Sequence, residues 1–193
     1  MKFDMVFDVQ KAFRKVVEAF SYPGDIVSFQ EEGRFLEDVD GCYPATMILM
    51  HMLLDTDTSF GVDSVDDQLA LQCSKMTHAR RVSFDKADYI FVTKEHPQRL
   101  AEIIEEAKEG TLENPHQSAT FIIECEQLIQ DGDLILEGCG ILDEKRVTIQ
   151  MEEAWLDARE KKNHEFPLGI DMILTDVFGN VMALPRTTRI KKG

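Results

Sequence analysis

Tyr89-Ile90-Phe91-Val92 is a compact apolar run of strand length, and residues 100–110, LAEIIEEAKEG, follow it closely. The first run predicts a buried strand. In the second segment, apolar residues recur with the spacing of one helical face: Leu100, Ile103, Ile104 and Ala107. Gly110 stands where a glycine commonly ends a helix. A buried strand followed by an amphipathic helix indicates a sheet that is covered by helices.

The same alternation of helix and strand extends toward the N-terminus. Apolar residues at helical spacing predict an amphipathic helix over residues 8–20, which Pro23 and Gly24 end. Residues 45–54 are apolar on almost every side, so we expect a buried helix there. The remaining expected elements are strands at 26–29 and 59–62, and a helix with Val65, Leu69, Cys73 and Met76 on one stripe.

The pattern changes in the second half of the chain. Residues 120–129 and 134–136 flank Asp131-Gly132, which predicts a hairpin. The other predicted strands are 147–151, 170–175 and 181–184, the last two joined by a turn at Gly179-Asn180. Because hairpins add antiparallel strands to a sheet that helices cover, we predict an α/β fold with a mixed sheet.

The chain is strongly acidic, since 36 Asp and Glu residues against 21 Lys and Arg give a formal net charge of −15 at pH 7. Such a surface repels nucleic-acid phosphates, so no nucleic-acid partner is expected. No apolar run is long enough to cross a bilayer, and the N-terminal residues do not resemble a secretory signal. We therefore expect a cytoplasmic protein that forms one domain over residues 1–193.

The four cysteines show no C-x-x-C spacing and no histidine pair of zinc-finger type. They are Cys42, Cys73, Cys125 and Cys139. In a reducing compartment we expect free thiols and no bound metal. Cys139 lies between two glycines, where a reactive thiol could be exposed, although the glycines are explained equally by a tight bend.

Asp55-Thr56-Asp57-Thr58 follows an apolar run and looks like the D-x-D-x-T signature of haloacid-dehalogenase-type phosphohydrolases. There the first aspartate attacks phosphorus, the second is the acid/base, and Mg²⁺ neutralises the charge between them. That chemistry requires the motif at the end of a buried strand. The preceding Met-rich run suits a helix better, so we interpret these residues as a helix end and a polar turn. His51 and Asp55, four residues apart, suit a local hydrogen-bonded pair better than a metal site.

Pro185-Arg186-Thr187-Thr188-Arg189 is the most suggestive segment for binding. Two guanidiniums and two hydroxyls in five residues could hold a phosphate or phosphonate oxygen. In so acidic a chain they could equally pair with carboxylates or contact another subunit. Both interpretations stay open for Arg186, Thr187, Thr188 and Arg189. The sequence contains no phosphate loop, dinucleotide fingerprint or nucleophile elbow.

Several longer stretches resemble one family. Residues 166–175, FPLGIDMILT, followed by 183–188, ALPRTT, are similar to the C-terminal signature of the PhnH family, the H subunits of the bacterial phosphonate carbon–phosphorus lyase system. Phe13-Arg14 and residues 19–24, AFSYPG, resemble the opening of the same family. The segments at residues 54–58 and 136–141 occur in the same order along the chain as in that family, so the resemblance covers nearly the whole chain.

The resemblance implies a three-layer α/β/α fold related to pyridoxal-phosphate-dependent transferases but without that cofactor. It implies a homodimer in isolation and assembly with the G, I and J subunits of the carbon–phosphorus lyase core complex. Such assemblies are linked to forming α-D-ribose 1-methylphosphonate 5-triphosphate from ATP and methylphosphonate. The family has no agreed catalytic residues, so no catalytic or cofactor-binding residue is assigned to this chain.

We accordingly predict an accessory, scaffolding subunit of a phosphonate-activating transferase complex. The alternative is a stand-alone Mg²⁺-dependent phosphohydrolase that uses Asp55 and Asp57. A purely structural homo-oligomer is the third possibility.

Overall fold

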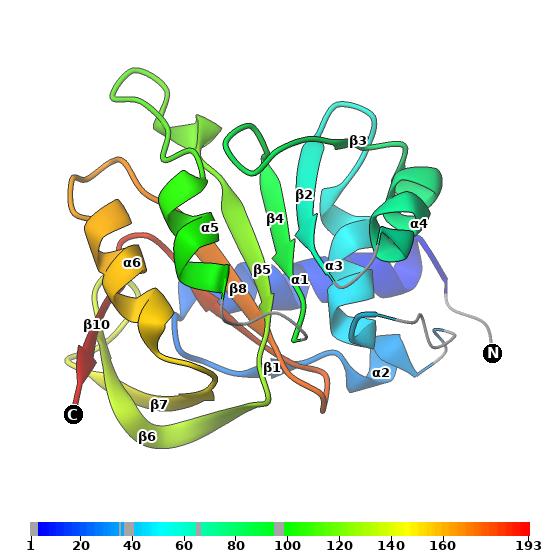
Figure 1. Ribbon diagram of the computed structural model, residues 1–193. Helices are drawn as coiled ribbons and strands as arrows, with labels where there is room; N and C mark the ends of the chain where they lie inside the picture. Colours follow the sequence, from blue (N-terminus) through cyan, green and yellow to red (C-terminus); the bar gives the residue numbers. More distant parts are fainter. Residues whose placement is uncertain (1–3, 35, 37–40, 65–66, 95–98) are drawn as a thin grey trace.

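A mixed sheet of seven strands forms the centre of the computed structural model, which describes residues 4–34, 36, 41–64, 67–94 and 99–193 (Figure 1). In spatial order its strands are β1 (Val27–Ser28), β9 (Asn180–Leu184), β8 (Asp171–Thr175), β5 (Thr120–Glu124), β4 (Tyr89–Val92), β2 (Ser59–Asp63) and β3 (Arg80–Arg81). The strands from β8 to β3 are parallel, whereas β9 and β1 are antiparallel to their neighbours. The predicted α/β fold with a mixed sheet is therefore confirmed.

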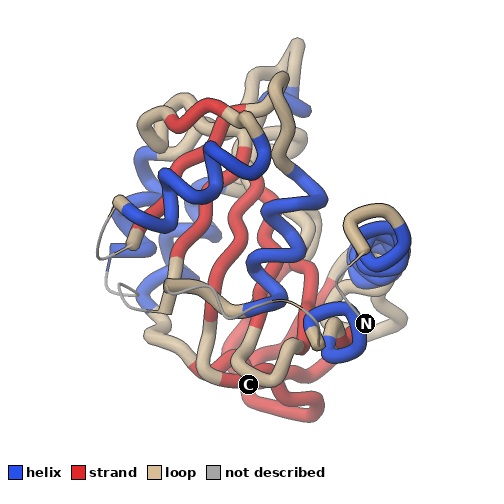
Figure 2. Tube along the Cα trace, turned by 90° about the vertical axis from the view of Figure 1, so that its right-hand side faces the viewer, coloured by secondary structure: helices blue, strands red, loops and turns tan. Residues whose placement is uncertain are grey.

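Helices cover both faces of this sheet (Figure 2). They are α1 (Phe7–Ser21), α2 (Gln30–Gly33), α3 (Pro44–Leu53), α4 (Gln68–Thr77), α5 (Leu100–Glu106) and α6 (Ala154–Lys162). Successive side chains along a strand point to opposite faces of the sheet, so each strand contributes to both cores. Ile122 of β5 belongs to the core with α1, α3 and α4, whereas its neighbours Phe121 and Ile123 belong to the core with α5 and α6. The sheet is apolar on both faces and each core is closed by helices.

A second, antiparallel sheet joins the core on the α5 and α6 side. Its strands, in spatial order, are β10 (Arg189–Lys192), β6 (Gln127–Glu137) and β7 (Lys145–Gln150). The hairpin predicted at Asp131-Gly132 is wrong, because β6 runs through both residues and pairs with β7 on either side of them. The register shifts between Gln130 and Leu134, so the two residues form a bulge and not a turn.

Close approach of β7 explains the glycine in this bulge. A Cβ at Gly132 would lie 1.8 Å from Oγ1 of Thr148 and 2.4 Å from its backbone nitrogen. Asp131 has a positive φ of 60°, a conformation that Asp tolerates better than most residues. The same residue types suit a turn and a bulge, which is why the local sequence was misleading.

Most other predicted elements are confirmed within a few residues. These are the helices at 8–20 and 45–54, the strands at 59–62, 89–92, 147–151, 170–175 and 181–184, and the helix beginning at Leu100. In α4, Leu69 and Cys73 are buried as expected, Met76 is exposed, and Val65 lies outside the described residues. Helices α2 and α6 and strands β3 and β10 were not predicted. No helix in the described part of the chain combines the length and apolar composition needed to span a bilayer.

We expect Gly132→Val to lower the free energy of unfolding by about 1–3 kcal/mol, since the new side chain must displace Thr148 or the β7 backbone. Urea denaturation followed by circular dichroism measures the change. The neighbouring variant Asp133→Ala, which alters an exposed side chain, is the control and should stay within about 0.5 kcal/mol of the wild type. Equal midpoints for both variants would show that the bulge does not require glycine.

Candidate functional site

The segment Pro185–Arg189 connects β9 to β10, at the edge where the parallel strands β5 and β8 begin. This position follows from the antiparallel pairing of β8 and β9, which sets Leu184 beside Met172. Ligands of open α/β sheets usually bind at the opposite edge, where parallel strands end. The predicted binding segment thus lies away from the usual ligand edge of such a sheet.

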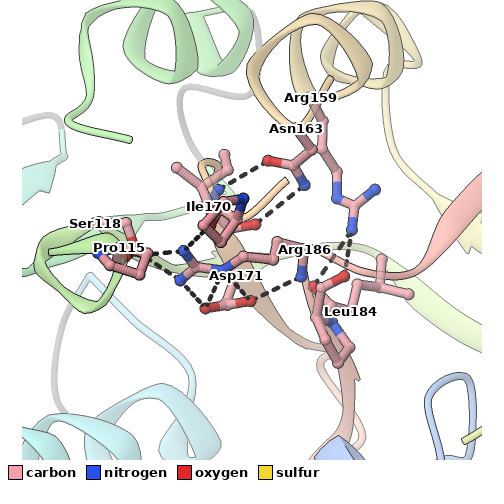
Figure 3. A network of polar contacts seen from close by, with 10 residues as sticks. Pro115, Ser118, Arg159, Asn163, Ile170, Asp171, Leu184 and Arg186 are labelled. Atoms are coloured by element: carbon pink, nitrogen blue, oxygen red, sulfur yellow. Dashed lines mark hydrogen bonds and ion pairs between the residues drawn. The ribbon is translucent and has the colours of Figure 1, made fainter. Parts of the chain in front are cut away.

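Arg186 is the centre of a polar network at this edge (Figure 3). Its Nε and Nη2 donate to the carboxylate of Asp171, at 3.2 Å and 2.5 Å from Oδ2. Its Nη2 also donates to Oγ of Ser118 at 2.6 Å, and Nη1 donates to the carbonyl oxygens of Pro115 and Pro167 at 3.0 and 3.2 Å. A guanidinium has five N–H groups, and these contacts can engage all of them. The geometry leaves no donor of Arg186 for a ligand.

A second arginine, Arg159 of α6, donates hydrogen bonds to the backbone of the same segment. It is only 3 % exposed, and its Nη atoms donate to the carbonyl oxygens of Thr188, Pro185 and Leu184 at 3.0, 2.8 and 3.5 Å. Burial lowers the pKa of Arg159 to about 10, against an opposing influence from the Asp171 carboxylate. Within the described residues, Arg159 forms no ion pair, and its Nε has no hydrogen-bond partner.

The segment also lines a groove of about 390 Å³ against α6. Among its lining residues are Arg159, Asn163, His164, Arg186, Thr188 and Arg189. Thr188 is buried and its hydroxyl has no partner among the described residues, while Thr187 is half-buried. Arg189 is exposed, and in the described part of the chain its side chain makes no hydrogen bond or ion pair. The four predicted residues are therefore brought together, but their side chains have different surroundings.

Sequence reasoning missed both Arg159 and Asn163. Asn163 closes the loop before β8, because its amide accepts from the N–H of Ile170 at 2.8 Å and donates to the same residue's carbonyl at 3.2 Å. Gly169 is needed beside it, since a Cβ there would lie 2.5 Å from Oδ1 of Asn163 and φ is +127°. The similarity of residues 166–175 to a family signature was the available signal for this loop.

The carboxylates at the opposite edge of the sheet have partners within the protein. Glu124, at the end of β5, accepts from the backbone N–H groups of Tyr43 and Lys94 at 2.5 and 3.2 Å. Burial raises the pKa of Glu124. Asp176, after β8, accepts from Leu128, Phe178 and Asn180. In the described residues, His, Cys, Asp and Glu form no group of three or more that could hold a metal ion.

Asp55 and Asp57 do not have the position that phosphohydrolase chemistry requires. They lie in a turn that leaves helix α3 and enters β2, so no strand precedes them. Asp55 Oδ1 accepts from the backbone N–H groups of Asp57 and Thr58 at 2.9 and 3.1 Å, and Thr58 Oγ1 accepts from the N–H of Asp55 at 2.8 Å. The predicted helix end with a polar turn is confirmed, and this context gives the phosphohydrolase alternative no support.

Three of the four cysteines are shielded from solvent to a large extent. Burial raises the pKa of Cys42, Cys73 and Cys125 to about 12, so these three stay protonated at neutral pH. Cys139 is exposed in the turn between β6 and β7. A Cβ on the adjacent Gly140 would lie 2.4 Å from the carbonyl oxygen of Ser21, so the tight-bend interpretation accounts for that glycine.

We expect Asp171→Ala to lower the free energy of unfolding by about 2–4 kcal/mol, because it leaves a largely buried guanidinium without its carboxylate. The double variant Asp171→Ala/Arg186→Met should cost less than the sum of the two single changes, since it removes both charges. Thermal and urea unfolding of the four proteins gives the coupling energy. Additive effects of the two changes would contradict the internal role assigned to Arg186.

Sequence comparison relates this chain to proteins of bacterial phosphonate metabolism. The family described as "Bacterial phosphonate metabolism protein (PhnH)" matches residues 2–191. HtxG from Stutzerimonas stutzeri, which is named as a proposed C-P lyase subunit protein, is 31 % identical over 185 residues, covering 94 % of this chain and 85 % of HtxG. The alpha-D-ribose 1-methylphosphonate 5-triphosphate synthase subunit PhnH from Rhizobium meliloti (strain 1021) is 27 % identical over 200 residues, covering 98 % of this chain and 93 % of that protein. Since the family match spans nearly the whole chain and the likeness to HtxG extends over most of both proteins, this chain belongs to the PhnH family of bacterial phosphonate metabolism proteins.

Proposed function

We propose that this chain is an accessory subunit of a carbon–phosphorus lyase assembly, with its function carried by a protein-binding surface. The proposal includes a homodimer in isolation and assembly with G, I and J subunits, in support of forming ribose 1-methylphosphonate 5-triphosphate from ATP and methylphosphonate. The names of HtxG and of the Rhizobium meliloti subunit support a role in such an assembly. The implied relation to transferases that use pyridoxal phosphate stays part of this proposal.

The surroundings of the reactive side chains favour a supporting role over an independent enzyme. Arg186 is engaged by Asp171 and by neighbouring oxygens, and Glu124 accepts backbone hydrogen bonds. Asp55 and Asp57 belong to a surface turn. Nucleophilic or acid–base catalysis requires a nucleophile and a base within hydrogen-bond reach of each other, in a position that a substrate can enter. These side chains instead stabilise the fold around them.

An exposed apolar stripe on α1 is the observation that carries the proposal. We define the α1 stripe as Val6, Phe13 and Val17, which are 71, 53 and 47 % exposed. They are seven and four residues apart, so they share one face of the helix. Ala12, Val16 and Ala19 occupy the buried face and hold α1 on the sheet. The stripe is therefore a second apolar face of α1 that the described part of the chain leaves exposed.

Further exposed apolar side chains lie at the two ends of the helix. Met5, Phe7 and Tyr22 are 50, 65 and 55 % exposed. Fully burying a side chain as large as Val or Phe contributes roughly 1.5–3 kcal/mol. Apolar and aromatic side chains are typical of the centre of a protein–protein interface. Burial of the α1 stripe against another subunit would therefore stabilise an assembly.

We expect Val17→Asp to abolish co-purification with the G, I and J subunits, because it places a charge within the α1 stripe. Complementation of a deletion strain with this variant should not restore growth on methylphosphonate as the sole phosphorus source. Growth on phosphate should be unaffected. Circular dichroism of the purified variant should match the wild type, since Val17 is exposed.

Leu71→Asp is the matched control, since Leu71 is 56 % exposed on α4 and lies outside the stripe. This variant should co-purify normally and restore growth. Light scattering of each protein alone distinguishes contact with a second copy from contact with other subunits. Normal co-purification and full complementation by Val17→Asp would refute the proposed role of the stripe.

A further inference from the structure

The groove between α6 and residues 186–191 carries an excess of positive charge. Its lining residues include four cationic side chains and one carboxylate: Arg159, Arg186, Arg189, Lys191 and Glu160. Asp171 balances the charge of Arg186, and Glu137 balances that of Lys191 through an ion pair of 2.7 Å. Among the lining residues, this leaves the two positive charges of Arg159 and Arg189 and the one negative charge of Glu160. Such a local excess is notable in a chain with a net charge of −15.

The base of the groove contains two polar groups without partners. Nε of Arg159 and Oγ1 of Thr188 are buried and form no hydrogen bond among the described residues. A buried guanidinium that lacks a carboxylate partner is unfavourable in the folded protein, and an unpaired buried hydroxyl adds to that cost. Asp171 also acts on Arg159, but it forms its ion pair with Arg186, so an anion in the groove would further compensate the charge of Arg159.

The rim of the groove supplies accessible donors. Arg189 and His164 are both exposed. A guanidinium matches the geometry of two oxygens of a tetrahedral anion, and an imidazole offers an N–H donor even when it is neutral. Figure 3 shows Arg159 directed toward the Leu184 side of the network, separate from the guanidinium of Arg186 that faces Asp171. The two arginines of this region therefore have different roles.

We propose that this groove binds a tetrahedral oxyanion of the phosphate or phosphonate type. Arg189 and His164 contact its oxygens, and Arg159 stabilises its charge from beneath. Arg186 takes no direct part, because its donors are engaged by Asp171, Ser118 and two carbonyl groups. The site follows from this chain's own residues and does not rest on the α1 stripe or on assembly with other subunits.

Isothermal titration calorimetry of the full-length protein tests the site, with inorganic phosphate and methylphosphonate as separate probes at constant ionic strength in chloride. We expect saturable binding of at least one probe with a stoichiometry near one. Tighter binding of methylphosphonate would identify organic phosphonates as the source of the anion, and the reverse would identify phosphate. Absence of saturable binding for both probes would overturn the proposal.

Two substitutions with opposite expected effects on the affinity test whether the anion binds in this groove. Arg189→Ala should weaken binding by at least about tenfold, as expected for loss of a charge-assisted hydrogen bond. Glu160→Gln should strengthen binding by about two- to fivefold, because it removes the carboxylate that lines the groove. Both residues are exposed, so both variants should keep the wild-type unfolding midpoint.

Arg80→Ala and Glu106→Gln are the matched controls. Arg80 is exposed on β3, at the far end of the sheet from β9, and Glu106 is exposed on α5. They change the net charge by the same amounts without altering the groove, so the affinity should stay within about twofold of the wild type. If Arg80→Ala weakened binding as much as Arg189→Ala, the anion would be responding to net charge and the proposed site would be wrong.

Discussion

The ion pair between Arg186 and Asp171 holds together the edge of the molecule where β5 and β8 begin. Asp171 is the first residue of β8, and Arg186 follows β9, so the pair locks the ends of two adjacent strands. Through Ser118, Pro115 and Pro167 the same guanidinium also fixes the segments that precede β5 and β8. Removing one member of such a pair leaves an uncompensated charge in a largely buried position, so the folded protein requires both residues.

This ion pair also limits which side chains of the segment remain available for binding. Together, Arg186 and Arg159 hold the chain as it leaves the sheet toward β10, one through a carboxylate and the other through backbone carbonyls. The segment Pro185–Arg189 is thus largely committed to the fold, with Arg189 left at the surface. Among the described residues, the α1 stripe is an accessible apolar surface that these contacts leave free. Such a surface suits a subunit that works within an assembly.

Local periodicity predicted the elements that pack by simple apolar faces, such as α3, β4 and the β8–β9 hairpin. Helix α6 was missed because its buried residues include Arg159 beside Trp155 and Ala158, so no apolar stripe marks the sequence. The bulge at Gly132 was mistaken for a turn because its cause, the approach of Thr148, lies on another strand. Likewise, the role of Arg186 depends on Ser118, 68 residues away, and no local pattern indicates such a contact.

Site-specific photocrosslinking from α1 tests the central claim most directly. A photoreactive phenylalanine analogue would replace Phe13, which is 53 % exposed at the middle of the stripe, and a second protein would carry it in place of Leu71 on α4. In cells that grow on methylphosphonate, irradiation should link position 13 to a subunit of the carbon–phosphorus lyase assembly or to a second copy of this chain, and position 71 to neither. Crosslinks from position 71 with none from position 13 would contradict the account.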